Sequence, residues 1–292
     1  MVISKPVPAS LTSDFRYCQD VVRSHRENFP VGSILLPSHM RRSLHAVYAF
    51  ARQADDFADL PGRADAERLR LLDDWSRRLE LAATGRPDHP IFRALAHTFQ
   101  ETGLTAQPLN ELLVAFRMDV TNKRYDTIAQ LEEYCRYSAH PVGRMVLHFA
   151  GVNDPEVLAW SDDICTGLQL TNHWQDLGQD PWKGRPLYLP KEEMDRFGVD
   201  EKMVLGRRFS PPLGQLMLYM VEETRRHFQA GRPLLRAVRW PFNLELALVW
   251  EAGMVLLDRI EGMAGNTLRR RPTLDTRDWL GCLLRAAGGG RS

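Results

Sequence analysis

Residues 168–180 carry four oxygen-bearing side chains at a spacing that could do chemistry. If this stretch is a helix, which turns by about 100° per residue, Gln169, Asn172, Asp176 and Asp180 fall within roughly 80° of one another. Amide and carboxylate oxygens on one stripe can bind a cation or a polar ligand; alternatively, the stripe is an ordinary solvated face. Lys, Arg and Glu usually solvate a surface helix, and their absence from the stripe favours the first interpretation.

A second acidic cluster lies upstream, within residues 46–62. Asp55 and Asp59 are four residues apart and would lie one above the other on a helix surface, with Arg52 one turn earlier and Asp56 at the edge of the same face. Carboxylates at this spacing repel one another unless a cation lies between them. Mg²⁺ takes oxygen ligands and typically binds one or two carboxylates together with substrate phosphates. Two such faces opposed across a cavity could hold a diphosphate through bridging metal ions.

The segment between the second stripe and residue 190 is irregular and basic. Lys183 and Arg185 follow Asp180 by a few residues, where a mobile loop could fold over a diphosphate and donate charge-assisted hydrogen bonds. The alternative is that both are solvated loop cations.

Helical periodicity and helix breakers recur along the chain, and no alternating strand run of useful length is present, so the expected fold class is all-α. Ser38 is expected to cap the helix that carries the first cluster. Asp154 is expected to cap the helix that carries the stripe, and Pro181 to end it, which leaves Asp180 at its C-terminal end. The expected helices span residues 11–26, 38–60, 64–83, 91–101, 106–120, 127–150, 155–180, 210–229, 242–263 and 274–287.

Composition and charge narrow the class of protein. The 292 residues are 44% hydrophobic, which is enough for a sizeable core. Because no linker or internal repeat is visible, we expect one all-helical domain over residues 1–292, with a loose arm at residues 1–10 and a frayed tail at residues 288–292. A formal net charge of +1, with both signs spread along the chain, carries no nucleic-acid signature. The four cysteines form no CxxC pair, so neither a zinc site nor a disulfide framework is indicated.

The cellular location expected from the sequence is cytoplasmic. The N-terminal residues lack the apolar run of a signal peptide. The longest apolar region, residues 244–257, is interrupted by Glu245 and Glu251 and is too short to span a bilayer.

Three motifs together resemble the squalene/phytoene synthase family, whose members are head-to-head isoprenoid synthases with an all-helical terpenoid-synthase fold. A bundle of twelve helices around a central cavity would fit the helical pattern of the chain. The resemblance runs from about residue 28 to about residue 188 and, more faintly, to the C-terminus. The motifs are DDxxD at residues 55–59, YCRYSAHPVG at residues 134–143 and QxxNxxxDxxxD at residues 169–180.

Within that family, two further segments look most like the bacterial hydroxysqualene synthases of hopanoid biosynthesis. They are ENFPVGSILLP at residues 27–37 and NHWQD at residues 172–176. This branch takes presqualene diphosphate as substrate. The resemblance implies Mg²⁺-dependent ionisation of that substrate with release of diphosphate, rearrangement of the resulting cyclopropylcarbinyl cation, and capture of the cation by water to give hydroxysqualene. No nicotinamide cofactor is expected, because the reaction ends in an alcohol.

The resemblance also assigns roles to residues. The expected metal ligands are Asp55, Asp56, Asp59, Asn172, Asp176 and Asp180. The expected catalytic residues are Asp55, Asp59, Asp176, Asp180, Arg52 and Tyr137. The expected substrate-binding residues are Asn28, Phe29, Tyr48, Gln169, Lys183, Arg185 and Arg271. The expected partners are presqualene diphosphate or another isoprenoid diphosphate, and other hopanoid-pathway enzymes. A triterpene product is almost insoluble in water, so this interpretation is also compatible with peripheral association with the inner face of a membrane. No clear amphipathic anchor is visible in the sequence.

Two departures from the wider family bear on the reaction. Gln175 stands where many relatives carry Arg before a motif aspartate, and Asn28-Phe29-Pro30 replaces small hydroxyl residues ahead of the first-motif helix. An altered diphosphate pocket is therefore expected, which weighs against the coupling of two farnesyl diphosphates. Two alternatives stay open: condensation of two farnesyl diphosphates to presqualene diphosphate, squalene or phytoene, and a non-catalytic helical assembly or binding protein.

Overall fold

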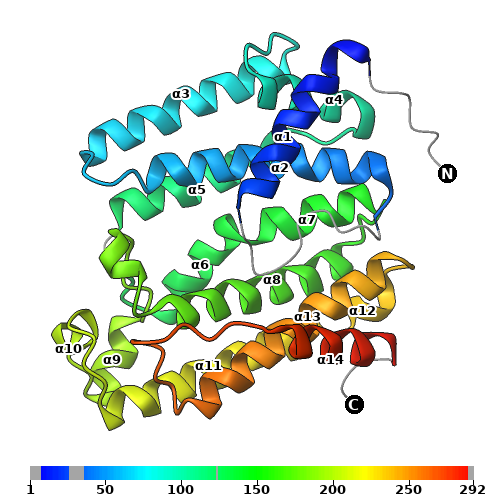
Figure 1. Ribbon diagram of the computed structural model, residues 1–292. Coiled ribbons are helices and arrows are strands. Elements are labelled where there is room, and N and C mark those ends of the chain that lie inside the picture. Colours follow the sequence, from blue (N-terminus) through cyan, green and yellow to red (C-terminus); the bar gives the residue numbers. More distant parts are fainter. Residues whose placement is uncertain (1–7, 26–35, 123, 289–292) are drawn as a thin grey trace.

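Two long helices, α2 (Ser38–Ala58) and α8 (Pro155–Asp176), carry the two aspartate motifs and line opposite sides of one cavity. The structure is a computed structural model that describes residues 8–25, 36–122 and 124–288. Figure 1 shows α8 near the middle of the molecule, with α1 to α5 on one side of it and α9 to α14 on the other. The aspartate-bearing helices are therefore held by neighbours on both sides.

The described residues contain fourteen α-helices and two 3₁₀ helices, and they contain no strand. The all-α fold class predicted from the sequence is confirmed. The ten expected helices are present, the one over residues 127–150 as two, and the short α9, α10 and α12 were not expected, so the total in the described residues is fourteen rather than twelve. The remaining elements are η1 (Ala9–Leu11), α1 (Thr12–Ser24), α3 (Asp65–Ala83), α4 (Pro90–Thr102), α5 (Gln107–Thr121), α6 (Ile128–Ser138), α7 (His140–Phe149), η2 (Asp180–Lys183), α9 (Lys191–Phe197), α10 (Glu201–Leu205), α11 (Pro211–Gly231), α12 (Leu234–Ala237), α13 (Phe242–Gly262) and α14 (Thr276–Ala287).

The core consists of two clusters of buried apolar side chains. One cluster draws mainly on α1 to α5, and the other mainly on α6, α8, α11 and α13. Met40 and Leu44 of α2 pack against both. Helix α2 thus joins the two clusters, and we propose that they belong to one domain.

Helix α8 turns one face to the core and the other to the cavity. Asp154 caps its N-terminus by accepting from the backbone N–H of Glu156 at 2.9 Å, and Pro155 occupies the first turn, as predicted. Trp174 is fully buried, and its Nε1 donates to Thr224 Oγ1 of α11 at 2.8 Å. This anchor fixes the rotation of α8, so the polar stripe has to face the cavity.

The end of α8 differs from the prediction. The helix ends at Asp176, and Asp180 begins the separate 3₁₀ helix η2. Pro181 has no N–H to continue the helical hydrogen bonds, and Gly178 lies so close to another segment that a Cβ there would be 2.0 Å from the carbonyl oxygen of Leu268. The chain tightens into turns instead. Asp180 nevertheless lines the same cavity as Asp176.

Two other helix boundaries were predicted wrongly. The helix expected over residues 127–150 is two helices, α6 and α7, separated at Ala139. Pro141 cannot donate a backbone hydrogen bond to Tyr137, which explains the break. Ser38 does not cap α2 but is its first helical residue; Pro37 occupies the cap position, and its carbonyl accepts from Arg41 N–H at 3.0 Å.

The contact at Gly178 leads to a prediction about stability. Gly178→Ala should lower the free energy of unfolding by about 2 kcal/mol or more, because backbone would have to move away from the new methyl group. Gly262→Ala is the matched control, since nothing lies within 4 Å of a Cβ there, and it should be neutral or stabilising by up to about 1 kcal/mol. Urea unfolding followed by circular dichroism measures both. Equal effects of the two substitutions would contradict the packing described.

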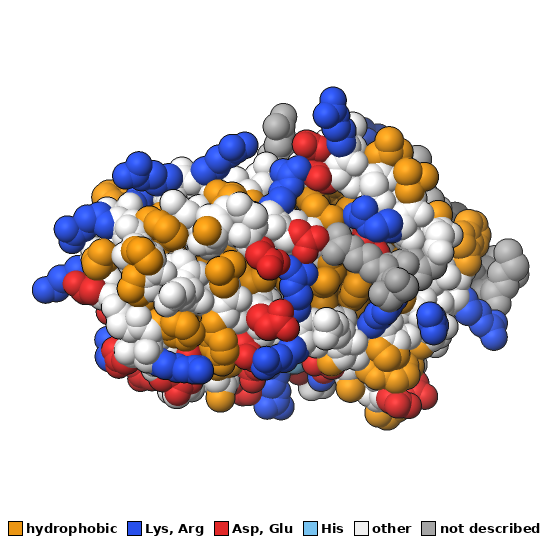
Figure 2. Space-filling model, turned by 90° about the horizontal axis from the view of Figure 1, so that it is seen from below, with side chains coloured by type: hydrophobic (Ala, Val, Ile, Leu, Met, Phe, Trp, Pro, Cys, Tyr) orange, Lys and Arg blue, Asp and Glu red, His pale blue; other side chains and the backbone are white. Residues whose placement is uncertain are grey.

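The surface carries mixed charges on the face seen in Figure 2, where Lys and Arg side chains are interspersed with Asp and Glu. This agrees with the formal net charge of +1. Within the described ranges, no helix has the length and apolar character needed to cross a membrane.

Candidate active site

A polar cavity of about 650 Å³ lies between α2 and α8. Pockets that hold small molecules typically have volumes of about 300 to 1,000 Å³. Both predicted acidic faces contribute to its wall, so the structure brings together two motifs that are more than a hundred residues apart in the chain. The predicted site residues that line it are Tyr48, Arg52, Asp55, Asp59, Gln169, Asn172, Asp176, Asp180, Lys183, Arg185 and Arg271.

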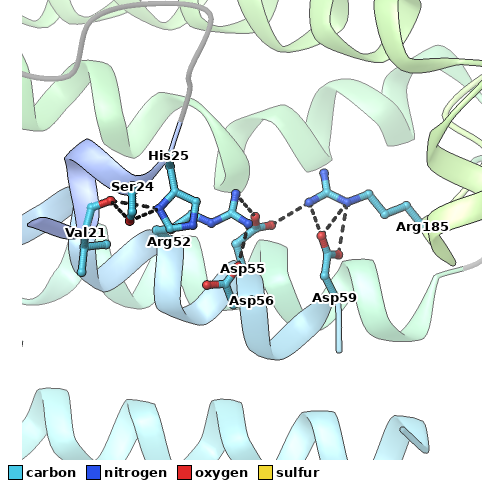
Figure 3. Close-up of polar contacts among 8 residues, drawn as sticks. All are labelled: Val21, Ser24, His25, Arg52, Asp55, Asp56, Asp59 and Arg185. Atoms are coloured by element: carbon cyan, nitrogen blue, oxygen red, sulfur yellow. Dashed lines mark hydrogen bonds and ion pairs between the residues drawn. The ribbon is translucent and has the colours of Figure 1, made fainter. Parts of the chain in front are cut away.

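On the α2 side of the cavity, Arg185 bridges the two motif aspartates (Figure 3). Its Nη2 donates to Asp55 Oδ1 at 3.0 Å, and its Nε donates to Asp59 Oδ2 at 3.0 Å. The guanidinium thus supplies the cation that two neighbouring carboxylates require. Even so, burial raises the pKa of Asp55 to about 6.

On the α8 side, Arg271 makes the corresponding contact with the second motif. Its Nε donates to Asp176 Oδ1 at 2.5 Å, and its Nη2 donates to Asp176 Oδ2 at 3.1 Å. Gln175 is fully buried, does not line the cavity, and donates from Nε2 to the carbonyl of Pro272 at 2.7 Å. Any effect of Gln175 on the pocket therefore goes through the segment that presents Arg271.

Asp180 is the most deeply buried of the four motif aspartates. Asp180 is only 5% exposed, and burial raises the pKa of its carboxyl group to about 7. The positive charges of Arg185 and Lys183 oppose this rise without cancelling it. A cation bound nearby would stabilise the ionised form of this buried carboxyl group.

Several predicted site residues lie elsewhere. Asp56 does not line the cavity; its side chain is 41% exposed and accepts from Arg52 Nη2 at 2.6 Å (Figure 3). Tyr137 lines neither this cavity nor the neighbouring apolar one, and it packs against the core beneath the guanidinium of Arg136. Asn28 and Phe29 lie outside the described residues.

An apolar cavity of about 300 Å³ adjoins the polar one. Tyr48 and Ala51 of α2 line both. Its other walls are formed mainly by aliphatic side chains of α2, α7, α8 and α13, such as Val47, Val146 and Leu168. The two cavities together can receive a ligand with a charged head and a hydrocarbon tail.

The donor atoms fit a hard divalent cation in their chemistry, but they are not gathered around one point. In the parts of the chain that the structure describes, no group of three or more His, Cys, Asp or Glu side chains is arranged to hold a metal ion. Arg185 and Arg271 instead contact the carboxylates of both motifs. Carboxylate and amide oxygens are the ligands of Mg²⁺, which keeps several waters and substrate phosphates in its shell. The residues fit Mg²⁺ only if the arginines release the carboxylates.

Sequence reasoning missed a buried polar cluster behind the α8 wall. Asp119 of α5 accepts from the hydroxyl groups of Tyr188 at 2.9 Å and Tyr134 at 3.1 Å. His173, which lines the polar cavity, stacks on the Tyr188 ring with centroids 3.7 Å apart, and burial lowers its pKa to about 3. The signal was the position of Asp119 seven residues after the buried Leu112, on the same face of α5. The cluster gives the cavity a rigid, hydrogen-bonded support.

Asp119 leads to a prediction about pH. Burial raises its pKa to about 7, so the folded chain keeps a proton that an unfolded carboxyl group gives up near pH 4. This contribution to stability is complete below pH 4 and is lost as the pH rises through 7. Asp119→Asn, which cannot ionise, should therefore show a shallower fall of the unfolding free energy between about pH 4 and pH 7 than the wild type, each pKa unit being worth about 1.4 kcal/mol.

Urea unfolding over a pH series in EDTA measures this difference. Asp195→Asn is the control, because Asp195 is exposed and pairs with Lys191 on the surface. Parallel pH profiles for wild type and Asp119→Asn would contradict the assignment of a raised pKa to Asp119.

The sequence of this chain is similar to those of known proteins. The sequence profile described as squalene/phytoene synthase matches residues 22–278. The 15-cis-phytoene synthase of Synechocystis is 32% identical, covering 94% of this chain and 86% of the relative. The hydroxysqualene synthase of Rhodopseudomonas palustris is 35% identical, covering 78% of this chain and 77% of the relative.

Solved structures agree with the sequence relatives. The squalene synthase of Alicyclobacillus acidocaldarius has a TM-score of 0.82 and 36% identity, covering 89% of this chain and 97% of that one. A dehydrosqualene synthase crystallised with a ligand has a TM-score of 0.84 and 25% identity, covering 96% and 97% of the two chains. The helical architecture is therefore that of these synthases.

Proposed function

This chain belongs to the squalene/phytoene synthase family, and from that premise we propose that it converts presqualene diphosphate to hydroxysqualene with release of diphosphate. Members of the family are enzymes that act on isoprenoid diphosphates. The observation that carries the proposal is the pairing of the two cavities, one lined by both aspartate motifs and the other apolar, which meet at Tyr48 and Ala51. The diphosphate would lie in the polar cavity and the isoprenoid chains in the apolar one.

The arginines of the polar cavity are the residues that would first meet the diphosphate. Arg185 and Arg271 each hold a motif carboxylate, and a guanidinium fits phosphate oxygens at least as well as it fits a carboxylate. Lys183 adds a third positive charge at the same wall. Transfer of the two guanidinium groups to the diphosphate frees the carboxylates of Asp59 and Asp176 and the Oδ1 atom of Asp55, whose Oδ2 stays 3.2 Å from Arg52 Nη1.

The freed oxygens, together with Asp180 and the amide of Asn172, are the groups that would hold Mg²⁺. When bound, Mg²⁺ supplies positive charge that stabilises diphosphate as a leaving group. The residues themselves contribute orientation, since Asp176 and Asn172 lie one turn apart on α8, and Asp55 lies in the last turn of α2 with Asp59 at its C-terminal cap. Their rigid helices hold the leaving group in one place while the carbon skeleton changes.

The bond changes balance without a reductant. The carbon–oxygen bond to the diphosphate breaks, and its electron pair leaves with the diphosphate. The cyclopropylcarbinyl cation rearranges, a water oxygen forms the new carbon–oxygen bond, and that water loses one proton. The apolar lining keeps other water away from the cation, and Tyr48, at the junction of the two cavities, offers a ring face to positive charge.

A second candidate function is head-to-head coupling: of two farnesyl diphosphates to presqualene diphosphate, and on to squalene if a nicotinamide reductant is supplied, or of two C20 isoprenoid diphosphates to phytoene. It is favoured by the phytoene synthase relative, which is 32% identical and covers 94% of this chain. The formation of hydroxysqualene is favoured by the hydroxysqualene synthase of Rhodopseudomonas palustris, whose identity with this chain is somewhat higher, at 35%. Association with a membrane surface and with other pathway enzymes stays a prediction.

Product analysis separates the two. The pure protein with Mg²⁺ and no NADPH is incubated with presqualene diphosphate and, separately, with farnesyl diphosphate. We expect hydroxysqualene from presqualene diphosphate and no consumption of farnesyl diphosphate. Consumption of farnesyl diphosphate would move the protein to the coupling branch. Inertness toward both substrates would favour either the coupling of C20 diphosphates or a non-catalytic binding protein, which a third incubation with a C20 isoprenoid diphosphate separates.

A further inference from the structure

A second pocket, of about 330 Å³, lies beside the polar cavity and is lined by cations without any acidic residue. Lys183, Arg207, Arg269 and Arg271 supply four positive charges to its wall. Arg271 is paired with Asp176. The other three form no ion pair with any residue in the described ranges, although the charge of Lys183 acts on the carboxyl group of Asp180, so the pocket keeps an excess of positive charge.

The pocket is built by a close contact between two segments. The turn at Gly178 lies directly against the backbone of Leu268, which brings residues 267–271 alongside η2. Arg207 closes the side, with its guanidinium 5.0 Å from the centre of the Trp182 ring. Trp182 itself is 67% exposed, so the stacked pair stands at the rim, where a charged ligand can enter.

Thr267 gives independent evidence that the pocket receives a ligand. The residue lines the pocket and is only 2% exposed, and its hydroxyl makes no hydrogen bond with the described residues. A buried hydroxyl without a partner costs about 1–3 kcal/mol. Such a group beside a cationic pocket is placed to donate a hydrogen bond to an anion.

The pocket communicates with the polar cavity, because Gln179, Lys183 and Arg271 line both. An anion that leaves the polar cavity can therefore pass to it without losing contact with Lys183 and Arg271. We propose that this pocket is a second anion-binding site, which takes inorganic diphosphate as it departs from the catalytic cavity. The source of the anion rests on the proposed function; the capacity to bind it does not.

The chemistry of the wall selects the ligand. Without carboxylates the pocket has no affinity for a metal ion, and it should bind diphosphate without Mg²⁺. Three unpaired cations and one hydroxyl match a compact anion that carries several negative charges and several acceptor oxygens. Orthophosphate, with fewer of both, should bind at least about tenfold more weakly.

Calorimetric titration of sodium diphosphate into the protein in EDTA tests the site. The wild type should bind diphosphate saturably. Arg207→Gln and Arg269→Gln should each weaken binding by about tenfold or more, since each removes a charge-assisted hydrogen bond. Arg86→Gln, an exposed arginine outside both pockets, is the control and should bind like the wild type. Two results would overturn the assignment. One is wild-type affinity for diphosphate in a protein that carries both Arg207→Gln and Arg269→Gln, and the other is equal affinity of the wild type for orthophosphate and diphosphate.

Thr267→Val separates a ligand-binding role from a structural one. Because the hydroxyl has no partner, valine of nearly the same shape should leave the melting temperature of the ligand-free protein unchanged or higher, yet weaken diphosphate binding by several-fold. Unchanged affinity in this variant would count against the site. A protein that binds diphosphate through Arg207 and Arg269 but turns over no substrate would refute the proposed function alone, whereas an active enzyme whose variants bind normally would refute this site alone.

Discussion

Replacing Asp55 and Asp176 together by asparagine is expected to abolish turnover while leaving the fold almost as stable as in the wild type. The two carboxylates face each other's helices across the polar cavity and contact arginines rather than the core. Each single substitution should lower the turnover rate at least about a hundredfold, because it removes charge that acts on the leaving group. The unfolding free energy should change by less than about 1 kcal/mol.

Asp56→Asn is the matched control for that experiment. Asp56 neighbours Asp55 in the sequence, but its side chain is 41% exposed and lies outside the cavity. Steady-state rates with presqualene diphosphate should therefore be within a few-fold of the wild type. If Asp56→Asn lowers the turnover rate as much as Asp55→Asn does, Asp56 is a metal ligand, as expected from the sequence. Near-normal turnover in the variant with both Asp55→Asn and Asp176→Asn would contradict the assignment of these aspartates as metal ligands.

Removal of the Arg185 side chain should have the second large effect. Arg185→Gln leaves Asp55 and Asp59 facing each other without the cation that now bridges them. The three side chains are 20% to 29% exposed, so the repulsion is only partly screened, and we expect a loss of about 1–3 kcal/mol in unfolding free energy near pH 7. Turnover should fall as well, because Arg185 is one of the groups proposed to receive the diphosphate.

The same variant offers a test of metal binding that does not depend on activity. Mg²⁺ can take the place of the missing guanidinium between the two carboxylates, so it should raise the melting temperature of Arg185→Gln more than that of the wild type. Arg144→Gln, which breaks an exposed pair with Asp162, should lose less than about 1 kcal/mol, and Mg²⁺ should raise its melting temperature no more than that of the wild type. An Arg185→Gln protein that is as stable as the wild type and indifferent to Mg²⁺ would contradict the proposed role of these carboxylates.

The long helices could be predicted from the sequence because each has a periodic apolar face and a clear signal at one end. Asp154 with Pro155, and Ser210 before Pro211, mark helix starts that the structure confirms. The errors lie where tertiary contacts or short segments decide. Gly178 against Leu268 ends α8 four residues before Asp180, and α12, with four residues, is too short to show any period.

Helix geometry was enough to predict which side chains of one helix lie together on the same face. Gln169, Asn172 and Asp176 do share one wall, since residues three or four apart lie on one face of a helix. Asp180 reaches the same cavity from η2, beyond the end of that helix. What the sequence could not reveal is the partner of each carboxylate. Arg271 reaches Asp176 from 95 residues away, and its segment is held by Gln175, which turns inward from the same helix.

The most direct test of the account is a reaction of presqualene diphosphate with the enzyme in H₂¹⁸O, with Mg²⁺ or with EDTA, followed by mass spectrometry of the product. We expect hydroxysqualene that carries ¹⁸O and forms only with Mg²⁺, because the carbon–oxygen bond breaks in the polar cavity and water captures the cation. An unlabelled alcohol would mean that a phosphorus–oxygen bond had been cleaved instead. That result, or a labelled product formed equally well in EDTA, would contradict the central claim.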